Sequence, residues 1–360
     1  MKSVIDILDL TVEEIDELVA TACDMIENPE KYSECCKGKT LATLFFEPST
    51  RTRLSFEAAM LELGGNVIGF SDAKNTSVSK GETIADTSRV VSCYSNIIAM
   101  RHPLEGAPLV ASMYASVPVI NAGDGGHAHP TQTLADLVTI YREKGRFNDL
   151  TVGFCGDLKY GRPVHSLINA LSRYTGIKIV LISPDELKLP EYTKREVIEK
   201  NNIPYEEISD LEKALPELDI LYMTRVQEER FDDPAEYARL KGCYVLTAEK
   251  LCNAKPDMAI LHPLPRVDEI SVDVDDDPRA CYFKQVANGK NVRKALILKL
   301  VTEAKNNPVA EKRGFEKLAG AKCENARCIR LKEAELAPLA ETKNGSEVKR
   351  CAYCESVLKI

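Results

Sequence analysis

Short runs of β-branched and aliphatic residues alternate with longer helical patterns through most of the chain. The strand-like runs are residues 40–46, 66–70, 96–101, 118–123, 151–157, 178–183, 219–225 and 258–263. The helical patterns lie at about 51–63, 81–93, 104–115, 130–145 and 162–174. Strands that alternate with helices are typical of βαβ units, because parallel strands need a long crossover between them. The alternation predicts an α/β protein with doubly wound parallel sheets.

The length of the chain and a break in the pattern predict two such domains. At 360 residues the chain exceeds the size at which one hydrophobic core stops growing. A new series begins after residues 146–150, which divides a first domain (1–146) from a second (147–287). An amphipathic pattern at about 291–304 predicts a helix, within 288–305, that returns to the first domain. The polar stretch 306–322 reads as a linker to a small cysteine-rich domain at 323–360.

The charge of the chain excludes two classes of partner. A formal net charge of −8 disfavours binding to nucleic acid or to an anionic membrane, because both attract basic proteins. No apolar run approaches the roughly 20 residues that span a bilayer. The N-terminal sequence is too acidic for a signal peptide. We therefore expect a cytoplasmic protein with no nucleic-acid or membrane partner.

The segment FFEPSTRTRLSF at 45–56 predicts an anion site at the start of a helix. Pro48 ends the preceding strand, and Ser49 or Thr50 can serve as the N-cap. Backbone N–H groups, the helix dipole, hydroxyls and the Arg51 guanidinium then converge, as a phosphate dianion requires. The alternative is a plain capped helix with a surface arginine.

Three motifs in the same order resemble the aspartate and ornithine carbamoyltransferases. They are FFEPSTRTRLSFEAAMLELGG, MRHP at 100–103 and HPTQTLADL at 129–137. The resemblance implies that the first substrate is carbamoyl phosphate. It assigns the phosphate to Ser49, Thr50, Arg51 and Thr52. It places Arg101, His129 and Gln132 near the carbamoyl group.

The residues themselves are compatible with these roles. His129 and Gln132 are three apart at a helix start, so they share one face. Pro130 at the first helical position and the preceding glycine-rich turn favour an exposed site. Arg101 ends a strand, where open parallel sheets bind ligands. Taken singly, His129 would be a structural cap or core residue and Arg101 a surface ion-pair partner.

Arginines also mark the site for the carbamoyl acceptor. Arg162 begins a helix, whereas Arg225 and Gln227 follow a strand. Two guanidiniums suit a dicarboxylate, since each can grip one carboxylate in fork geometry, and ornithine would need an acidic partner instead. HPLPRVDEI at 262–270 resembles the aspartate-specific loop, whereas ornithine enzymes carry HCLP. The resemblance implies L-aspartate as acceptor, with Leu264 and Pro265 offering backbone carbonyls to the carbamoyl nitrogen.

The polar, small-residue-rich loop at 71–87 reads as a mobile lid. By resemblance, Ser77 and Lys80 of one subunit reach the active site of its neighbour, and Lys80 binds aspartate. This implies a homo-oligomer built on a catalytic trimer with shared sites. The loop is one residue shorter than the usual form of the family. Lys80 could equally be a solvated loop charge.

The resemblance implies transfer of the carbamoyl group to L-aspartate, the committed step of pyrimidine (UMP) biosynthesis. Thr52, Arg101 and His129 would stabilise the carbonyl oxygen as it becomes anionic. The reaction needs no redox or organic cofactor. Two alternatives remain, which are an ornithine or other carbamoyltransferase and a catalytically silent scaffold protein.

Four of the twelve cysteines crowd together near the end of the sequence, as CENARC (323–328) and CAYC (351–354). The other eight are scattered and read as small buried hydrophobic residues. The spacing is C-x4-C, a longer gap and then C-x2-C, which lets Cys323, Cys328, Cys351 and Cys354 hold one tetrahedral Zn²⁺. Two local disulfides or four free thiols are the alternatives.

This segment resembles the zinc domain of the aspartate carbamoyltransferase regulatory chain, here on the same chain as the catalytic part. The larger nucleotide-binding domain of that regulatory chain is absent, so control by CTP or ATP is not carried over. We expect a structural zinc that docks the segment onto a catalytic subunit or joins trimers.

Overall fold

The computed structural model describes residues 2–72, 76–226, 234–307, 314–342 and 348–359. The chain forms two compact units. Unit 1 contains residues 1–131 and 290–360, and unit 2 contains residues 132–289. The division therefore falls within two helices, α5 (Pro130–Lys144) and α10 (Tyr282–Asn306). Each unit is described by itself.

Unit 1 contains a four-stranded, wholly parallel sheet in the order β2-β1-β3-β4. Its strands are β1 (Thr40–Phe45), β2 (Asn66–Phe70), β3 (Ile97–His102) and β4 (Val119–Asp124). Its crossover helices are α2 (Thr50–Glu62), α3 (Ile84–Ser92) and α4 (Ala107–Tyr114). Each lies where the sequence predicts it. Every residue of β4 is buried, as expected of a strand covered on both faces.

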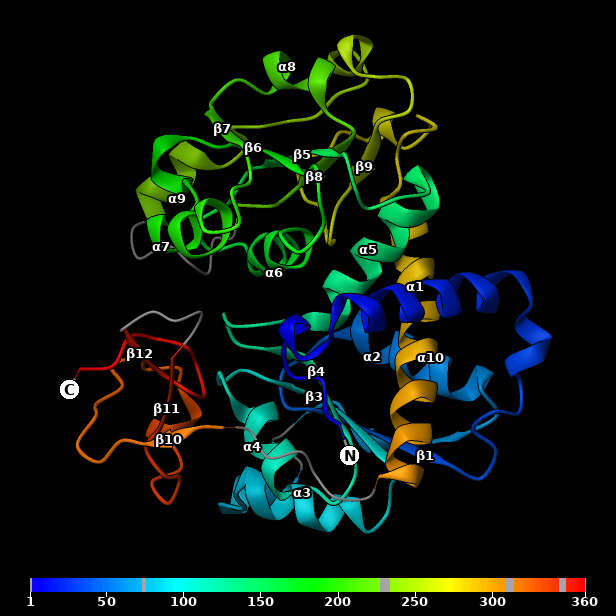
Figure 1. Cartoon of the computed structure of the whole chain (residues 1–360), viewed down its shortest axis with the longest axis vertical. Coiled ribbons are helices and arrows are strands. Elements are labelled where there is room, and N and C mark those ends of the chain that lie inside the picture. Colours follow the sequence, from blue (N-terminus) through cyan, green and yellow to red (C-terminus); the bar gives the residue numbers. More distant parts are fainter. Residues whose placement is uncertain (1, 73–75, 227–233, 308–313, 343–347, 360) are drawn as a thin grey trace. The chain divides into compact units, whose positions relative to one another are not determined.

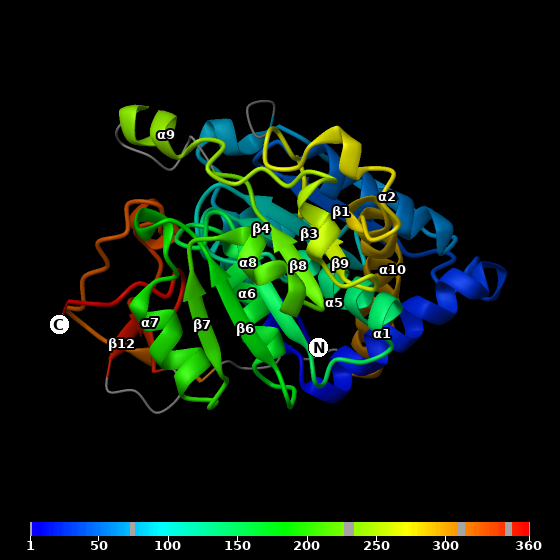
Figure 2. The same ribbon diagram turned by 90° about the horizontal axis from the view of Figure 1, so that it is seen from above.

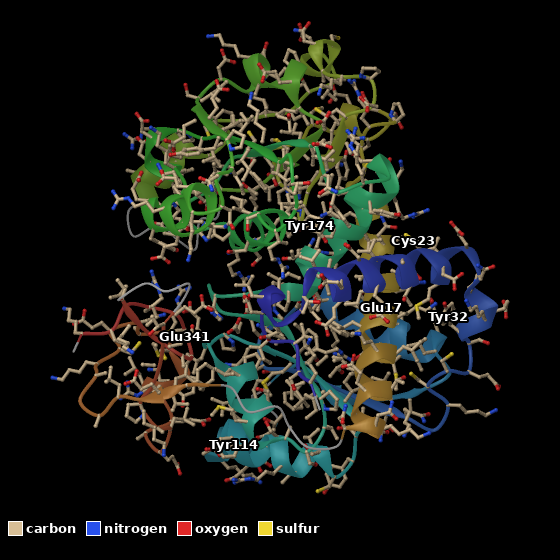
Figure 3. The ribbon with its side chains drawn as sticks, in the orientation of Figure 1. Glu17, Cys23, Tyr32, Tyr114, Tyr174 and Glu341 are labelled. Atoms are coloured by element: carbon tan, nitrogen blue, oxygen red, sulfur yellow. The ribbon has the colours of Figure 1, made fainter. Side chains whose placement is uncertain are left out.

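Two helices from the ends of the catalytic part also belong to unit 1. The N-terminal helix α1 (Val12–Glu27) begins with a capping box of Thr11 and Glu14. Lys299 of α10 donates to Glu17 of α1 at 2.8 Å, and Figure 3 labels Glu17 where α1 passes α10. Lys294 of α10 lies 3.2 Å from Glu62. The C-terminal part of α10 therefore packs against α1 and α2 within unit 1.

Unit 2 contains a five-stranded parallel sheet in the order β7-β6-β5-β8-β9. Figure 2 shows β7, β6 and β8 pointing in one direction. The strands are β5 (Thr151–Cys155), β6 (Lys178–Ile182), β7 (Tyr205–Ile208), β8 (Ile220–Met223) and β9 (Ala259–Leu261). The helices are α6 (Arg162–Leu171), α7 (Glu191–Thr193), α8 (Leu211–Ala214) and α9 (Pro234–Leu240). The predicted α/β architecture is confirmed, with β7 as an edge strand that the sequence did not reveal.

The cysteine tail, described for residues 314–342 and 348–359, forms a small antiparallel sheet within unit 1 (Figure 1, orange to red beside α4). Its strands are β10 (Glu316–Lys317), β11 (Leu339–Thr342) and β12 (Lys349–Cys351). The tail shares one hydrophobic cluster with β3 and α4. Gly106 precedes α4 with a φ of 84°, and a Cβ there would lie 2.5 Å from the Tyr353 carbonyl oxygen. Tyr353 of the tail therefore packs directly against the backbone of Gly106, where a side chain would not fit.

Within the described ranges, none of the helices combines the length and the apolar composition that crossing a bilayer requires.

Gly106→Ala is expected to release the tail. Left-handed backbone costs alanine about 1–2 kcal/mol, and here the new methyl group would also collide with Tyr353. Gly145→Ala is the matched control, since Gly145 also has a positive φ (69°) but no heavy atom within 4 Å of its Cβ position. We expect a larger loss of melting temperature for Gly106→Ala, together with rapid tryptic removal of the tail. Equal effects of the two variants would contradict this packing.

Candidate active site and cysteine cluster

Three loops of unit 1 meet because β1, β3 and β4 are neighbours and end at the same edge of the sheet. The first loop runs from β1 into α2, the second follows β3, and the third runs from β4 to His129. Six of the predicted site residues lie on these loops or at the adjoining ends of β3 and α2. They are Ser49, Thr50, Arg51, Thr52, Arg101 and His129.

The start of α2 has the features of an anion site. Ser49 occupies the N-cap position, yet its side chain makes no capping hydrogen bond. The first backbone N–H groups of a helix have no partners within it and carry partial positive charge. Arg53 is bound to Glu57 at 2.7 Å, one turn along the helix, so it serves the helix itself. Arg51 has no such partner one turn on, because that position is Ser55.

Arg101 and His129 meet at Gly123, the fifth residue of β4. A Cβ on Gly123 would lie 3.0 Å from Nη1 of Arg101 and 3.2 Å from Cδ2 of His129. With a φ of 119° and no side chain, Gly123 lets both groups approach the same point. Arg101 is 12% exposed and its Nη2 lies 3.3 Å from Glu47 Oε1. Its Nε is buried without a hydrogen-bond partner among the described residues.

Arg51 lies close enough to Arg101 for the two charges to interact. Burial lowers the pKa of the Arg51 guanidinium, and repulsion from Arg101 lowers it further. Two neighbouring guanidiniums beside a helix start repel one another, and an anion bound between them offsets this repulsion. This cluster can therefore bind a doubly charged anion.

The turn from Asp124 to His129 is held by a buried carboxylate. Asp124 is fully buried and accepts hydrogen bonds from Gly106 N at 2.8 Å and from Ala128 N at 3.0 Å. His127 Nδ1 lies 3.0 Å from the same carboxylate. His127 Nε2 lies 3.2 Å from Oε1 of Glu355 in the tail, an ion-pair distance. Burial opposes the charged imidazole, but the two carboxylates outweigh it and raise the pKa of His127 well above its usual value.

Ser77 and Lys80 occupy a short 3-10 helix (Ser77–Lys80) and both are exposed. Beside them, Val78 and Gly81 line a cavity of about 590 Å³ whose opposite wall includes Glu333 of the tail. The Glu333 carboxylate accepts a hydrogen bond from Ile84 N at the start of α3, 2.7 Å away.

In unit 2, the predicted acceptor residues share one edge of the second sheet. Arg162 begins α6 after β5, and Arg225 follows β8, the neighbour of β5. Leu264 and Pro265 follow β9, the next strand along, and are joined by a cis peptide bond. All three loops follow the carboxyl ends of parallel strands. Gln227 lies outside the described residues.

Two buried carboxylates support this edge. Gln132 donates to Asp136 at 2.8 Å, and the other Asp136 oxygen accepts from the Tyr222 hydroxyl at 2.9 Å. The Gln132 side chain therefore serves a structural contact in addition to any ligand. Glu269 lies 2.6 Å from His262 Nε2, and Nδ1 of that ring accepts from Leu264 N at 2.8 Å. Burial raises the pKa of Glu269, but the His262 contact outweighs it and lowers it overall.

The four tail cysteines form a compact cluster. All four are buried and reduced, and their sulfur atoms lie within 4.8 Å of one another. Cys323 and Cys354 are separated by 3.5 Å, and Cys328 and Cys351 by 3.8 Å. Four sulfurs around a tetrahedral zinc, with bonds of 2.3 Å, lie about 3.8 Å apart. The cluster fits a metal ion and excludes the alternative of two disulfides, which need S–S bonds of about 2.05 Å.

Sequence reasoning missed three residues that shape these sites. Gly123 and Glu47 belong to motifs that were recognised, but their contacts with Arg101 join strands distant in sequence. The ion-pair contact between His127 and Glu355 of the tail joins residues far apart in the sequence and leaves no local pattern. The glycine-rich turn before His129 was the available signal, and it indicated only an exposed loop.

Two family descriptions match the chain. The carbamoyl-P binding domain of aspartate/ornithine carbamoyltransferase matches residues 2–142, and the Asp/Orn binding domain of that family matches residues 148–300. An aspartate carbamoyltransferase catalytic subunit from Lachnoclostridium phytofermentans is 62% identical over 301 residues, covering 84% of this chain and 98% of that protein. The one from Clostridium acetobutylicum is 63% identical over 300 residues, covering 83% of this chain and 98% of that protein.

Solved structures give the same result. The catalytic subunit of M. jannaschii aspartate transcarbamoylase is 48% identical, with a TM-score of 0.80 over 85% of this chain and all of that one. Aspartate transcarbamoylase from Trypanosoma cruzi, solved with carbamoyl phosphate and aspartate, is 36% identical, with a TM-score of 0.78 over 83% of this chain and 96% of that one. The matched domains end at residue 300, before the cysteine tail. By sequence and by fold, the chain belongs to the aspartate/ornithine carbamoyltransferase family.

Proposed function

We propose that the protein is an aspartate carbamoyltransferase, which converts carbamoyl phosphate and L-aspartate into N-carbamoyl-L-aspartate and phosphate. The observation that carries the proposal is the convergence of Arg51, Arg101 and His129 at the carboxyl edge of the first sheet. Relatives above 60% identity carry this name over nearly their whole length. The reaction would be the committed step of pyrimidine biosynthesis. The reduced state of all twelve cysteines supports a cytoplasmic location.

The first substrate would bind to unit 1. Ser49, Thr50 and Arg51 hold the phosphate at the start of α2. Thr52, Arg101 and His129 donate to the carbonyl oxygen, whose negative charge grows as the tetrahedral intermediate forms. The buried Arg101 Nε, which lacks a protein acceptor among the described residues, supports a bound anion at this point.

The second substrate would bind to unit 2. Arg162 and Arg225 bind the two carboxylates of aspartate, and Gln227, together with Lys80 of a neighbouring subunit, also binds aspartate. Gln132 and the backbone carbonyls of Leu264 and Pro265 bind the carbamoyl nitrogen of the first substrate. The arginines on neighbouring strands β5 and β8 support a dicarboxylate over ornithine. We assign residues 1–146 and 147–287 to these two substrates.

The chemistry needs positioning and electrostatic stabilisation, without a covalent enzyme intermediate. The aspartate amine attacks the carbamoyl carbon, the oxyanion collapses, and phosphate leaves with its bonding electron pair. The amine proton passes to the leaving phosphate. Binding both reactants in one site supplies much of the rate enhancement.

The purified chain is expected to form carbamoylated product from carbamoyl phosphate and L-aspartate, detected colorimetrically, and none from L-ornithine. The acceptor arginines attract a second carboxylate and repel the ornithine side-chain cation. Product from ornithine would identify the other subclass, and product from neither acceptor would identify a silent member of the family.

His129→Ala is expected to lower kcat on the order of 10²-fold, the cost of losing one donor to a developing oxyanion. The affinity for inorganic phosphate should stay unchanged, because the α2 start remains intact. Steady-state kinetics and calorimetric titration with inorganic phosphate test the two statements. Undiminished turnover would remove His129 from the mechanism.

A trimer with shared active sites accounts for two features of unit 1. Ser77 and Lys80 are exposed, so a neighbouring subunit could receive them. Large apolar side chains are exposed on α2 and on the edge strand β2 of unit 1, which would suit a subunit interface. They are Leu54 (57% exposed), Leu61 (59%) and Ile68 (40%).

We propose that the four tail cysteines hold one structural Zn²⁺, as in the zinc domain of a regulatory chain. Four buried thiolates cannot be left uncompensated, and bound zinc keeps them deprotonated. The tail has a small sheet and little core of its own, so the metal would supply folding energy. The ion would take no part in the reaction.

Metal analysis is expected to find one zinc per chain, and chelation is expected to lower the melting temperature. Loss of the metal removes the crosslink that joins the two cysteine pairs, so the tail should become sensitive to trypsin. Light scattering before and after chelation shows whether the metal also supports the oligomer. A chelated protein with unchanged melting and unchanged mass would contradict a structural zinc.

A further inference from the structure

Glu105 links the cysteine tail to the turn that leads to His129. Its backbone N–H donates to Arg327 O at 2.8 Å, and its carbonyl accepts from Ile329 N at 3.0 Å, so it brackets Cys328. Its carboxylate accepts from Asn325 of the tail at 2.5 Å and from Gly126 N of the turn at 3.0 Å. The side chain is buried, and burial raises the pKa of its carboxyl group. One residue thus holds both segments.

A second link connects the other cysteine pair to the same turn. Glu355 directly follows Cys354, and its Oε1 lies 3.2 Å from His127 Nε2. The other ring nitrogen of His127 lies 3.0 Å from the fully buried Asp124. The imidazole is therefore held between a carboxylate of the tail and a carboxylate of unit 1.

Close packing leaves the turn little freedom. A Cβ on Gly125 would lie 2.7 Å from Pro103 O and 2.8 Å from Glu105 Cγ. Asp124 fixes the far side through Ala128 N at 3.0 Å. His129 comes next in the chain, and its ring meets Arg101 at Gly123. A displacement of His127 would therefore move His129 relative to Arg101.

We propose that the metal-loaded cysteine tail positions His129 through Glu355 and His127, which are positioning residues for the transfer reaction. The inference rests on the proposed function of His129 and on metal binding by the four cysteines. Neither Glu355 nor His127 touches the reacting atoms. They fix the turn on which the oxyanion donor is carried.

The competing explanation is that the tail only stabilises unit 1. Apolar side chains of the tail share a cluster with α4 and β3, and this packing could hold the tail without Glu355. Removing the Glu355 charge therefore separates the two explanations, because the apolar contact and the cysteines remain. A stabilising tail would lose a little melting temperature, whereas a positioning tail would lose turnover.

Glu355→Gln is expected to lower kcat roughly 10-fold, since small misplacements of a catalytic group are costly. KM for both substrates, metal content and melting temperature should change little, because His129 acts on the transition state. Lys359→Gln is the matched control, as it removes an exposed ion pair within the tail, 2.7 Å from Glu324. It should leave kcat unchanged.

His127→Gln removes the other partner of the ion pair with Glu355 and leaves the tail sequence intact. It keeps hydrogen-bonding capacity but not the imidazolium charge. If Glu355→Gln fails to retain metal, this variant still tests the link. It should lower kcat like Glu355→Gln, and combining the two substitutions should add little, as expected for partners in one interaction.

The chain has five histidines, so ¹⁵N-histidine NMR reports the link without reference to catalysis. Chelation of the full chain, and Glu355→Gln, should shift the signals of His127 and His129. The signals of His165 and His262, in unit 2, should stay in place. Lys359→Gln should move none of the four.

The outcomes separate the two proposals. Chelation that lowers the melting temperature but leaves the His129 signal and kcat unchanged would show that the tail is only a stabilising element. A His129 signal that responds in a wild-type chain without transferase activity would overturn the proposed function and leave the mechanical link standing. Unchanged kcat in both Glu355→Gln and His127→Gln overturns the positioning role.

Discussion

Parallel strand pairing is the constraint on which both candidate half-sites depend. All pairs in the two large sheets run in the same direction, so the carboxyl ends collect at one edge of each sheet. In unit 1 this geometry brings Arg51 near Arg101, and Arg101 near His129, although the three residues lie far apart in the sequence, at the start of α2, near the end of β3 and after β4. Each crossover helix then covers the sheet and leaves the loops free for chemistry.

The cluster of Arg51, Arg101 and His129 in unit 1 includes an interaction that lowers the stability of the fold. The guanidiniums of Arg51 and Arg101 repel one another. Among the described residues, Glu47 forms an ion pair with Arg101. Gly123 has no side chain, so Arg101 and His129 can approach each other there. A glycine at this position loses more conformational entropy on folding than another residue would. Strain of this kind is commonly retained where a ligand supplies the missing charge. The buried Asp124 of the same unit is engaged by hydrogen bonds from Gly106 N, Ala128 N and Asn121, which makes the turn before His129 rigid.

Local patterns predicted most of the fold, and distant contacts account for what they missed. Buried strands such as β3 read as continuous apolar runs, whereas the edge strand β7, with its sequence YEEI, shows charged residues and no such run. Helix α10 begins at Tyr282, well before the amphipathic pattern at 291. Gly289 is a poor helix former and interrupts the helical pattern between the two positions. The motif residues lie at neighbouring strands within each unit, and their binding roles stay predictions. Cysteine spacing predicted a four-sulfur cluster. It did not indicate that the tail would contact Glu105 and His127, because those contacts join residues far apart in the sequence.

The tail packs on α4 and β3 of its own chain, and this changes how its attachment responds to dilution. A separate metal-binding subunit would dissociate once its concentration fell below the dissociation constant. A tethered segment instead experiences an effective concentration that is typically in the millimolar range for short linkers. Rebinding after each local opening is therefore intramolecular and independent of how much protein is present. The stoichiometry of the cysteine cluster to the anion site is fixed at one to one by the peptide chain itself.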